Sequence, residues 1–254
     1  MMTPPKTVAV VGFKDSGKTL TVETLVAELT RRGHSVGTLK HTAENIAFDT
    51  PGKDTARHRD AGAKAAAILH KDAAAIFIDG HVPIGDAANA LGTLDYLVIE
   101  GFKTLDTHAR ILVPRGDDDT PRLSNGLELA AVKIHGSRFM GDTNLPVVNL
   151  ADAEALADIV EEKAYPMLPG VNCRGCGYQD CRSLGKAILA GEAQASQCVR
   201  NSVEFTLRIN DKPVPIGGFV RRAFKGMLIG FLRSLKGGEN PRKIEIAFEV
   251  DDHE

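Results

Sequence analysis

The chain has no tryptophan, few aromatic residues (5%) and no long hydrophobic run among its 254 residues. A helix that spans a membrane needs about 20 consecutive apolar residues, so we expect no membrane span. The apolar run near the start, Val8–Phe13, is also too short for the hydrophobic region of a secretory signal. We therefore expect a cytoplasmic protein.

A marked excess of charge of either sign is also missing. The formal net charge is −2 at pH 7, so no overall positive field attracts nucleic acid, and we expect no nucleic-acid partner. Basic residues do gather near the C-terminus, where ten stand against three acidic residues between Arg200 and Lys243. This local excess indicates either an ordinary solvated face or a docking surface for an anionic ligand or partner.

Cysteine is scarce, and its four occurrences lie in one short segment with the spacing C-x2-C-x4-C-x16-C: Cys173, Cys176, Cys181 and Cys198. In the reducing cytoplasm, clustered thiols are more often metal ligands than disulfides. Thiolates concentrated in one place, with none elsewhere, therefore predict a single metal centre.

What the sequence does contain is the alternation of strands and helices typical of an α/β fold. Thr7–Phe13 is a valine-rich run, as expected of a strand buried on both faces. Thr19–Arg32 repeats apolar residues at helical spacing, and Ser35–His41 has the pattern of a second strand. Strand, loop, helix and strand form the βαβ unit of a parallel sheet.

The pattern continues as a mostly parallel sheet. Four further strands are expected at Tyr96–Ile99, Ile111–Val113, Leu129–Ile134 and Val147–Leu150. A short helix is expected at Pro83–Leu91, and a closing helix at Ala151–Ala164. The segment Thr42–Gly62 is polar and is expected to be a long functional loop. Two apolar runs, Ala65–Leu69 and Ala73–Ile78, follow it.

Gly12–Thr19 matches the phosphate-binding motif G-x-x-x-x-G-K-[ST] in full, between a buried strand and a helix. Glycines let backbone N–H groups turn toward phosphate oxygens, and the helix N-terminus adds a favourable dipole. Lys18 is expected to reach the β- and γ-phosphates, and the Thr19 hydroxyl to ligate Mg²⁺. The residues expected to contact the nucleotide are Gly12, Lys14, Asp15, Ser16, Gly17, Lys18, Thr19, Lys40 and His41, the last two at the end of the second strand.

A carboxylate is expected to hold or orient the Mg²⁺ ion or the attacking water. Glu100 is the first candidate, because it ends a buried strand and is followed by Gly101. Asp49 and Asp54, in the polar loop, compete for the same role, although loop acids often only cap turns. Lys18, Asp49, Asp54 and Glu100 are thus the candidate catalytic residues.

Four blocks in this order resemble the MobB family, the accessory GTP-binding proteins of molybdopterin guanine dinucleotide synthesis: Gly12–Thr19, Gly37–His41, Asp49–Ala63 and Val98–Lys103. The resemblance covers roughly residues 7 to 164. It implies a homodimeric P-loop protein that binds GTP, with weak Mg²⁺-dependent GTP hydrolysis. Its expected partner is the guanylyltransferase that attaches GMP to molybdopterin, or a molybdoenzyme or tungstoenzyme.

The cysteine segment begins as a glycine-rich loop and continues into a helical stretch, Arg182–Ala190. Zinc sites usually pair two short cysteine knuckles, whereas here only Cys173 and Cys176 form one. This favours a [4Fe–4S] cluster over zinc or unligated thiols. The segment also resembles the small iron–sulfur domain of Rnf-type electron-transfer subunits and of corrinoid iron–sulfur proteins, in about thirty residues.

The last segment is expected to fold as a small β-α-β unit. Its elements are a strand at Val203–Ile209, an apolar and basic helix at about Phe219–Leu235, and an alternating strand at Ile244–Val250. A helix packed on the two strands is the simpler interpretation, and a helix that docks on a partner or membrane surface is the alternative.

Together these patterns predict an α/β P-loop nucleotide-binding domain (1–164), an iron–sulfur module (165–200, after a boundary at Pro166 and Pro169) and a small basic α+β tail (201–254). The favoured function is a GTP-binding accessory protein of molybdenum (or tungsten) cofactor synthesis. The alternatives are a nucleotide-gated electron-transfer protein, a metallochaperone NTPase and a non-catalytic scaffold.

Overall fold

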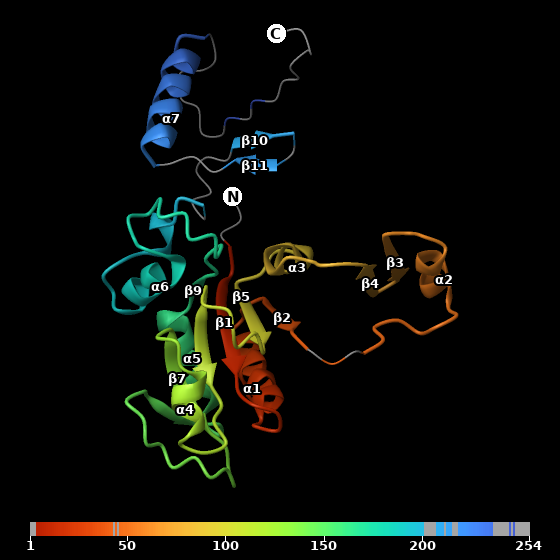
Figure 1. Ribbon diagram of the computed structural model, residues 1–254, viewed down its shortest axis with the longest axis vertical. Coiled ribbons are helices and arrows are strands. Elements are labelled where there is room, and N and C mark those ends of the chain that lie inside the picture. Colours follow the sequence, from red (N-terminus) through yellow and green to blue (C-terminus); the bar gives the residue numbers. More distant parts are fainter. Residues whose placement is uncertain are drawn as a thin grey trace.

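The structure is a computed structural model, and it describes residues 4–42, 44, 46–200, 207–210, 212–214, 218–235, 244 and 246. A seven-stranded sheet forms its body (Figure 1). The order across the sheet is β2 (Val36–Lys40), β5 (Tyr96–Glu100), β1 (Lys6–Val11), β6 (Ala109–Leu112), β7 (Glu128–Lys133) and β8 (Val147–Asn149). These neighbours are all parallel, and the expectation of a mostly parallel α/β sheet is confirmed.

The central strand is as deeply buried as its valine run predicts. Val8, Ala9, Val10 and Val11 have no exposed surface. One face of the sheet packs against α1 (Lys18–Arg31) and α5 (Ala153–Lys163), whose core residues include Leu25, Leu29, Leu156 and Val160. The other face is covered by α3 (Ile84–Ala90), α4 (Asp119–Leu123) and loop residues, among them Phe139. The sheet is therefore the middle layer of a doubly covered α/β domain.

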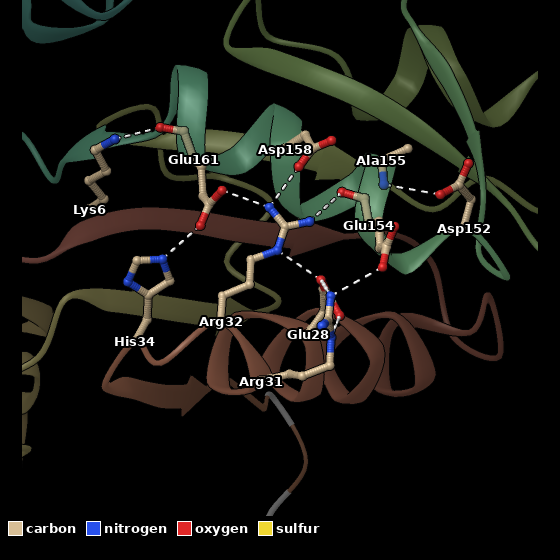
Figure 2. Close-up of polar contacts among 10 residues, drawn as sticks. All are labelled: Lys6, Glu28, Arg31, Arg32, His34, Asp152, Glu154, Ala155, Asp158 and Glu161. Atoms are coloured by element: carbon tan, nitrogen blue, oxygen red, sulfur yellow. Dashed lines mark hydrogen bonds and ion pairs between the residues drawn. The ribbon is translucent and has the colours of Figure 1, made fainter.

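An ionic network fixes α1 to α5 on the first face (Figure 2). Arg32, just after α1, donates to Glu28 at 2.8 Å, to Asp158 at 2.6 Å and to Glu161 at 2.7 Å. His34 contacts the other oxygen of Glu161 at 2.6 Å. Hydrogen bonds from Arg31 and Arg32 lower the pKa of Glu28 to about 2. The helix that follows the phosphate loop is thus tied to α5 at the end of the helix remote from that loop.

The polar segment after β2 is not a loop throughout. It contains α2 (Asp54–Asp60), and the apolar runs that follow form a hairpin of β3 (Ala65–His70) and β4 (Ala73–Ile78) that pair only with each other. Figure 1 shows this lobe, α2 with β3 and β4, set apart from the main sheet. The hairpin escaped prediction as a separate lobe because apolar alternation does not say which partner covers a strand.

The segment from Tyr165 to Arg200 packs on the main sheet. β9 (Tyr165–Pro166) pairs antiparallel with the start of β1, and Leu168 donates its N–H to the carbonyl of Thr107 at 2.8 Å. α6 (Cys181–Leu189) confirms the expected helix, and its Leu184 is fully buried. A Cβ built on Gly185 would lie 2.6 Å from the Tyr165 hydroxyl and 2.9 Å from Leu127, so the helix backbone approaches the sheet closely there.

The tail is described only in part. β10 (Leu207–Ile209) and β11 (Lys212–Val214) form a short hairpin, and α7 (Gly218–Arg233) confirms the expected helix. The expected strand at 244–250 lies outside the described residues, except for Ile244 and Ile246. Val220, Met227 and Phe231 of this helix are more than half exposed, and most residues of the two strands on which the helix is expected to pack lie outside the described part of the chain. In the described part of the chain, none of the helices is long and apolar enough to cross a membrane.

Candidate functional site

The phosphate loop follows β1 at the carboxyl edge of the sheet and leads into α1. Gly17 has a φ of 87°, and a Cβ there would lie 2.1 Å from the Ile134 side chain, so only glycine fits. A Cβ on Gly12 would lie 2.3 Å from Ser16 Oγ and 2.6 Å from the Val113 carbonyl. The loop is therefore closed tightly around its own backbone, as a phosphate cradle requires.

Lys18 and Ser16 offer polar groups at this cradle. The Lys18 ammonium donates to the Phe13 carbonyl at 2.6 Å, across the mouth of the loop. Burial lowers the pKa of Lys18, and the nearby Glu100 carboxylate opposes that shift. Ser16 is 7% exposed, and its buried Oγ has no hydrogen-bond partner among the described residues. The Ser16 hydroxyl can therefore turn to a phosphate oxygen without losing a partner, whereas Lys18 would exchange the Phe13 carbonyl for one.

Glu100 lies at the expected place beside the loop. The Thr19 hydroxyl lies 3.2 Å from both carboxylate oxygens, and Lys40 Nζ lies 3.1 Å from one of them. Gly101 has a φ of 99° and donates to the carbonyl of Val10. A hydroxyl and a carboxylate together supply oxygen ligands of the kind that Mg²⁺ prefers. The donor set therefore fits Mg²⁺.

His41 and Lys14 lie at the rim of the same site. The N–H of His41 donates to the Glu100 carbonyl at 2.9 Å, and its ring stacks on Phe102 with centroids 4.2 Å apart. Lys14 is exposed and pairs with Glu44 at 3.5 Å. Asp15 has a φ of 58°, so the backbone of the phosphate loop is left-handed at this residue.

Asp49 and Asp54 are not brought to the phosphate loop. Asp49 accepts hydrogen bonds from the Thr50 N–H at 2.8 Å and from Thr55 Oγ1 at 3.1 Å, at the start of α2. Asp54 is the exposed first residue of that helix. Figure 1 shows α2 well separated from α1. In this arrangement Glu100 is the one of the three candidate acids that contacts Thr19.

Sequence reasoning missed Phe13 as a feature of the site. Three cations lie over its ring, at 4.6 Å (Lys103 Nζ), 4.9 Å (Arg115 Cζ) and 4.6 Å (Arg122 Cζ) from the centroid. The cations come from the segments after β5 and β6 and from α4. No periodic signal links such distant positions, so only the fold reveals the cluster.

The four cysteines are not joined in disulfides, and they differ in burial. Cys173 is exposed and Cys176 half-buried, whereas Cys181 and Cys198 are 7% and 4% exposed within the core. Around the first pair, three residues (Asn172, Arg174 and Gly177) have positive φ. Within the described part of the chain, no three His, Cys, Asp or Glu side chains converge to hold a metal ion. The donor set, four cysteine thiols in one segment, fits an iron–sulfur cluster or zinc.

The two candidate sites lie at opposite edges of the sheet. The phosphate loop begins after Val11 at the carboxyl end of β1, whereas β9 pairs with the amino end of β1, and Leu168, shortly before the cysteines, contacts Thr107 ahead of β6. β1 has six residues, and strands rise about 3.3 Å per residue, so the edges are on the order of 20 Å apart. Figure 1 shows α6 beside β9 and away from α1.

Comparisons with known proteins agree with both halves of this description. The family model "Molybdopterin guanine dinucleotide synthesis protein B" matches residues 7–135. A second model, described as "Putative Fe-S cluster", matches residues 168–200.

Relatives and a solved structure extend the likeness. A Methanocaldococcus jannaschii protein named "Putative molybdopterin-guanine dinucleotide biosynthesis adapter protein" is 28% identical, over 96% of this chain and 98% of its own length. The molybdopterin-guanine dinucleotide biosynthesis adapter protein of Escherichia coli (strain K12) is 28% identical over 61% of this chain and 90% of its own. The crystal structure of Bacillus subtilis MobB is 25% identical, with a TM-score of 0.53, over 63% of this chain and 98% of that chain. Because the first family model covers half of the sequence and includes the phosphate loop and Glu100, the chain belongs to the MobB family.

Proposed function

We propose that this protein is a GTP-binding adapter of molybdopterin guanine dinucleotide synthesis that carries a [4Fe–4S] cluster. The contact of Thr19 and Lys40 with Glu100, directly beside a complete phosphate loop, is the observation that carries the nucleotide half. Membership of the MobB family supports guanine and the adapter role. The four cysteines, none of them in a disulfide, and the matching iron–sulfur model support the cluster.

In the proposed nucleotide site, Lys18 leaves the Phe13 carbonyl and donates to the β- and γ-phosphate oxygens. Thr19 and Glu100 would hold Mg²⁺, which would supply positive charge at the phosphates for a slow in-line attack by water. Lys40 keeps the Glu100 carboxylate oriented through its 3.1 Å contact. Asp49 and Asp54 serve in catalysis only if the α2 lobe of the same chain, or of a second copy, approaches the loop.

In the proposed cluster site, Cys173, Cys176, Cys181 and Cys198 are the ligands. The cluster supplies a one-electron redox couple when bound. Cys181 and Cys198 provide the fixed half of the donor set because they are buried in the core. Cys173 and Cys176 provide the more exposed half, and Asn172 and Arg174, on either side of Cys173, both have positive φ. We accordingly divide the chain at 164 and 200, with the tail at 201–254 as the surface for the partner.

A homodimer is part of the proposal. In the β3–β4 hairpin, cross-strand pairing places Leu69, Ile76 and Ile78 on one face, and their exposed fractions are 80%, 60% and 51%. The other face carries Phe77, which lies 5.5 Å under Arg59 of α2. An exposed apolar strip of this kind is typical of an interface. Leu69→Asp should convert a dimer into a monomer in light-scattering measurements.

The test of the nucleotide half is a titration of Mg²⁺–GTP and Mg²⁺–ATP by calorimetry. We expect GTP to bind more tightly than ATP. We also expect Glu100→Gln to weaken the Mg²⁺-dependent part of binding by about tenfold, the typical contribution of a charge-assisted contact. Asp106→Asn, an acid of the loop after β5, is the matched control. Equal GTP affinity of the Glu100→Gln and control variants would contradict the assignment of Glu100.

A further inference from the structure

The cations around Phe13 form a second charged group beside the phosphate loop. Each of the three lies within 4.9 Å of the ring centroid, although they come from three separate segments of the chain. Lys103 is exposed, and Arg115 and Arg122 are 46% and 64% exposed. Cations gathered on one aromatic ring gain a modest attraction from it, but they also repel one another.

Two buried residues hold this cluster in place. Asp119, 7% exposed at its side chain, accepts from the Arg115 N–H and Nε, both at 3.0 Å, and lies 4.0 Å from Arg122. Arg110, 1% exposed, donates to the carbonyls of Lys103 at 3.3 Å and of Leu123 at 3.0 Å. Arg110 therefore holds the backbone at Lys103 and next to Arg122, and Asp119 holds the side chain of Arg115.

The charge of the cluster is not balanced. Asp119 is the carboxylate that pairs with Arg115 and Arg122, and Lys103 has no ion pair with a carboxylate in the part of the chain that the structure describes. The three cations outnumber the carboxylates beside them, even with Asp15, which contributes after Asp119 to raising the pKa of Arg115. A phosphate monoester carries about −1.5 to −2 charges at pH 7, so this positive excess would attract it.

We propose that Lys103, Arg115 and Arg122, gathered around Phe13, bind the phosphate monoester of a second ligand while a nucleotide occupies the phosphate loop. Guanidinium groups recognise phosphate oxygens through paired N–H donors, and the Phe13 ring holds the three cations close together. This inference rests on the proposed function. There the product joins a guanine nucleotide to a pterin, and a phosphate monoester on the pterin half is the ligand chemistry that suits this cluster.

The test uses the full-length protein with its phosphate loop filled by Mg²⁺ and a non-hydrolysable GTP analogue. Phenyl phosphate and inorganic phosphate are then titrated by calorimetry. The expected result is saturable binding of phenyl phosphate. Its affinity should fall by about tenfold in Arg115→Gln and again in Arg122→Gln, because each change removes a charge-assisted contact. Lys71→Gln, an exposed cation at the tip of the β3–β4 hairpin, is the matched control and should bind like the wild type.

The two probes separate the sources of binding. Tighter binding of phenyl phosphate than of inorganic phosphate supports a ligand with an aromatic group next to its phosphate, and equal binding supports recognition of the phosphate alone. Absence of binding for both probes while the GTP analogue still binds would overturn this site and leave the proposed function intact. A parallel loss of GTP-analogue affinity in the arginine variants would also overturn it, because the cations would then belong to the nucleotide site. Failure of the wild type to bind the GTP analogue would instead contradict the proposed function.

Discussion

The two edges of the sheet carry sites that are built in different ways. At the carboxyl edge, the polar groups already contact one another: Lys18 meets the loop carbonyl, and Thr19 and Lys40 meet Glu100. At the amino edge, two cysteines are buried and two are not, and no three thiols converge. A phosphate site is therefore preformed by the backbone, whereas the ligands of a thiolate site come together when the metal binds.

Position adds to this contrast. The two edges are separated by the length of β1, on the order of 20 Å, so a ligand at one edge does not touch a ligand at the other. Both edges nevertheless share one core, which contains Val10, Leu25 and Leu29 together with Tyr165, Cys181 and Cys198. Any coupling between nucleotide and cluster therefore runs through packing of α1, β1 and β9, and not through direct contact. This favours an adapter with two separate sites over a protein in which the nucleotide lies against the cluster.

The largest expected effect is a loss of nucleotide binding at the carboxyl edge, with the amino edge unchanged. Gly17→Val should lower nucleotide affinity by at least about 100-fold, because φ is 87° and a Cβ would collide with Ile134 at 2.1 Å. Calorimetry with Mg²⁺–GTP measures the loss. Gly226→Ala is the control, since its Cβ meets open space in α7. Iron content should stay at the wild-type value, and its loss in Gly17→Val would show that the edges are not independent.

The next largest effect is a loss of iron at the amino edge, with nucleotide binding unchanged. Cys181→Ser should remove most of the bound iron after anaerobic purification, because a hydroxyl is a poor ligand for iron–sulfur clusters. Ser196→Ala, an exposed position in the same segment, should retain it. Iron and sulfide assays give the result. An Mg²⁺–GTP affinity changed by more than about tenfold in Cys181→Ser would contradict the separation of the sites.

A third change loosens the amino edge without touching a ligand. Gly185→Ala should destabilise the protein by about 1–3 kcal/mol, the usual cost of overpacking a core, because the added methyl meets Tyr165 and Leu127. Chemical denaturation compared with Gly226→Ala measures the difference. Equal midpoints for the two variants would mean that α6 does not pack on the sheet as described.

The smallest expected effect concerns the network that ties α1 to α5. Hydrogen bonds from Arg31 and Arg32 hold the pKa of Glu28 at about 2, below the ordinary 4.5. A carboxylate with a lowered pKa stabilises the fold above its unfolded pKa and loses that contribution as the pH falls from about 4.5 toward 2. Arg32→Ala should therefore reduce the drop in Tm between pH 5 and pH 2, compared with Arg57→Ala. An unchanged drop would remove Glu28 from the acid response.

Much of the carboxyl edge was predictable because its signals are local. The strand, the glycines and the helix of the phosphate loop are contiguous in sequence, and Glu100 ends a strand with its own apolar run. The apolar residues Leu184, Ile188 and Leu189 likewise predicted α6. By contrast, the pairing of β9 with β1 joins residues about 160 positions apart. The exposure of Leu69 likewise depends on which distant parts of the chain pack against the β3–β4 hairpin. Short-range patterns carry no information about such contacts, and the Phe13 cluster escaped for the same reason.

The most direct test of the account is a distance between the two edges. The protein is purified without oxygen, Mn²⁺ replaces Mg²⁺ with a bound GTP analogue, the cluster is reduced, and pulsed electron paramagnetic resonance measures the coupling between the two metals. The account predicts about four irons per chain and a separation on the order of 20 Å, set by the rise of β1. An iron-free protein would contradict the cluster. A strong coupling at less than about 10 Å, half that strand length, would contradict the placement of the two sites at opposite edges.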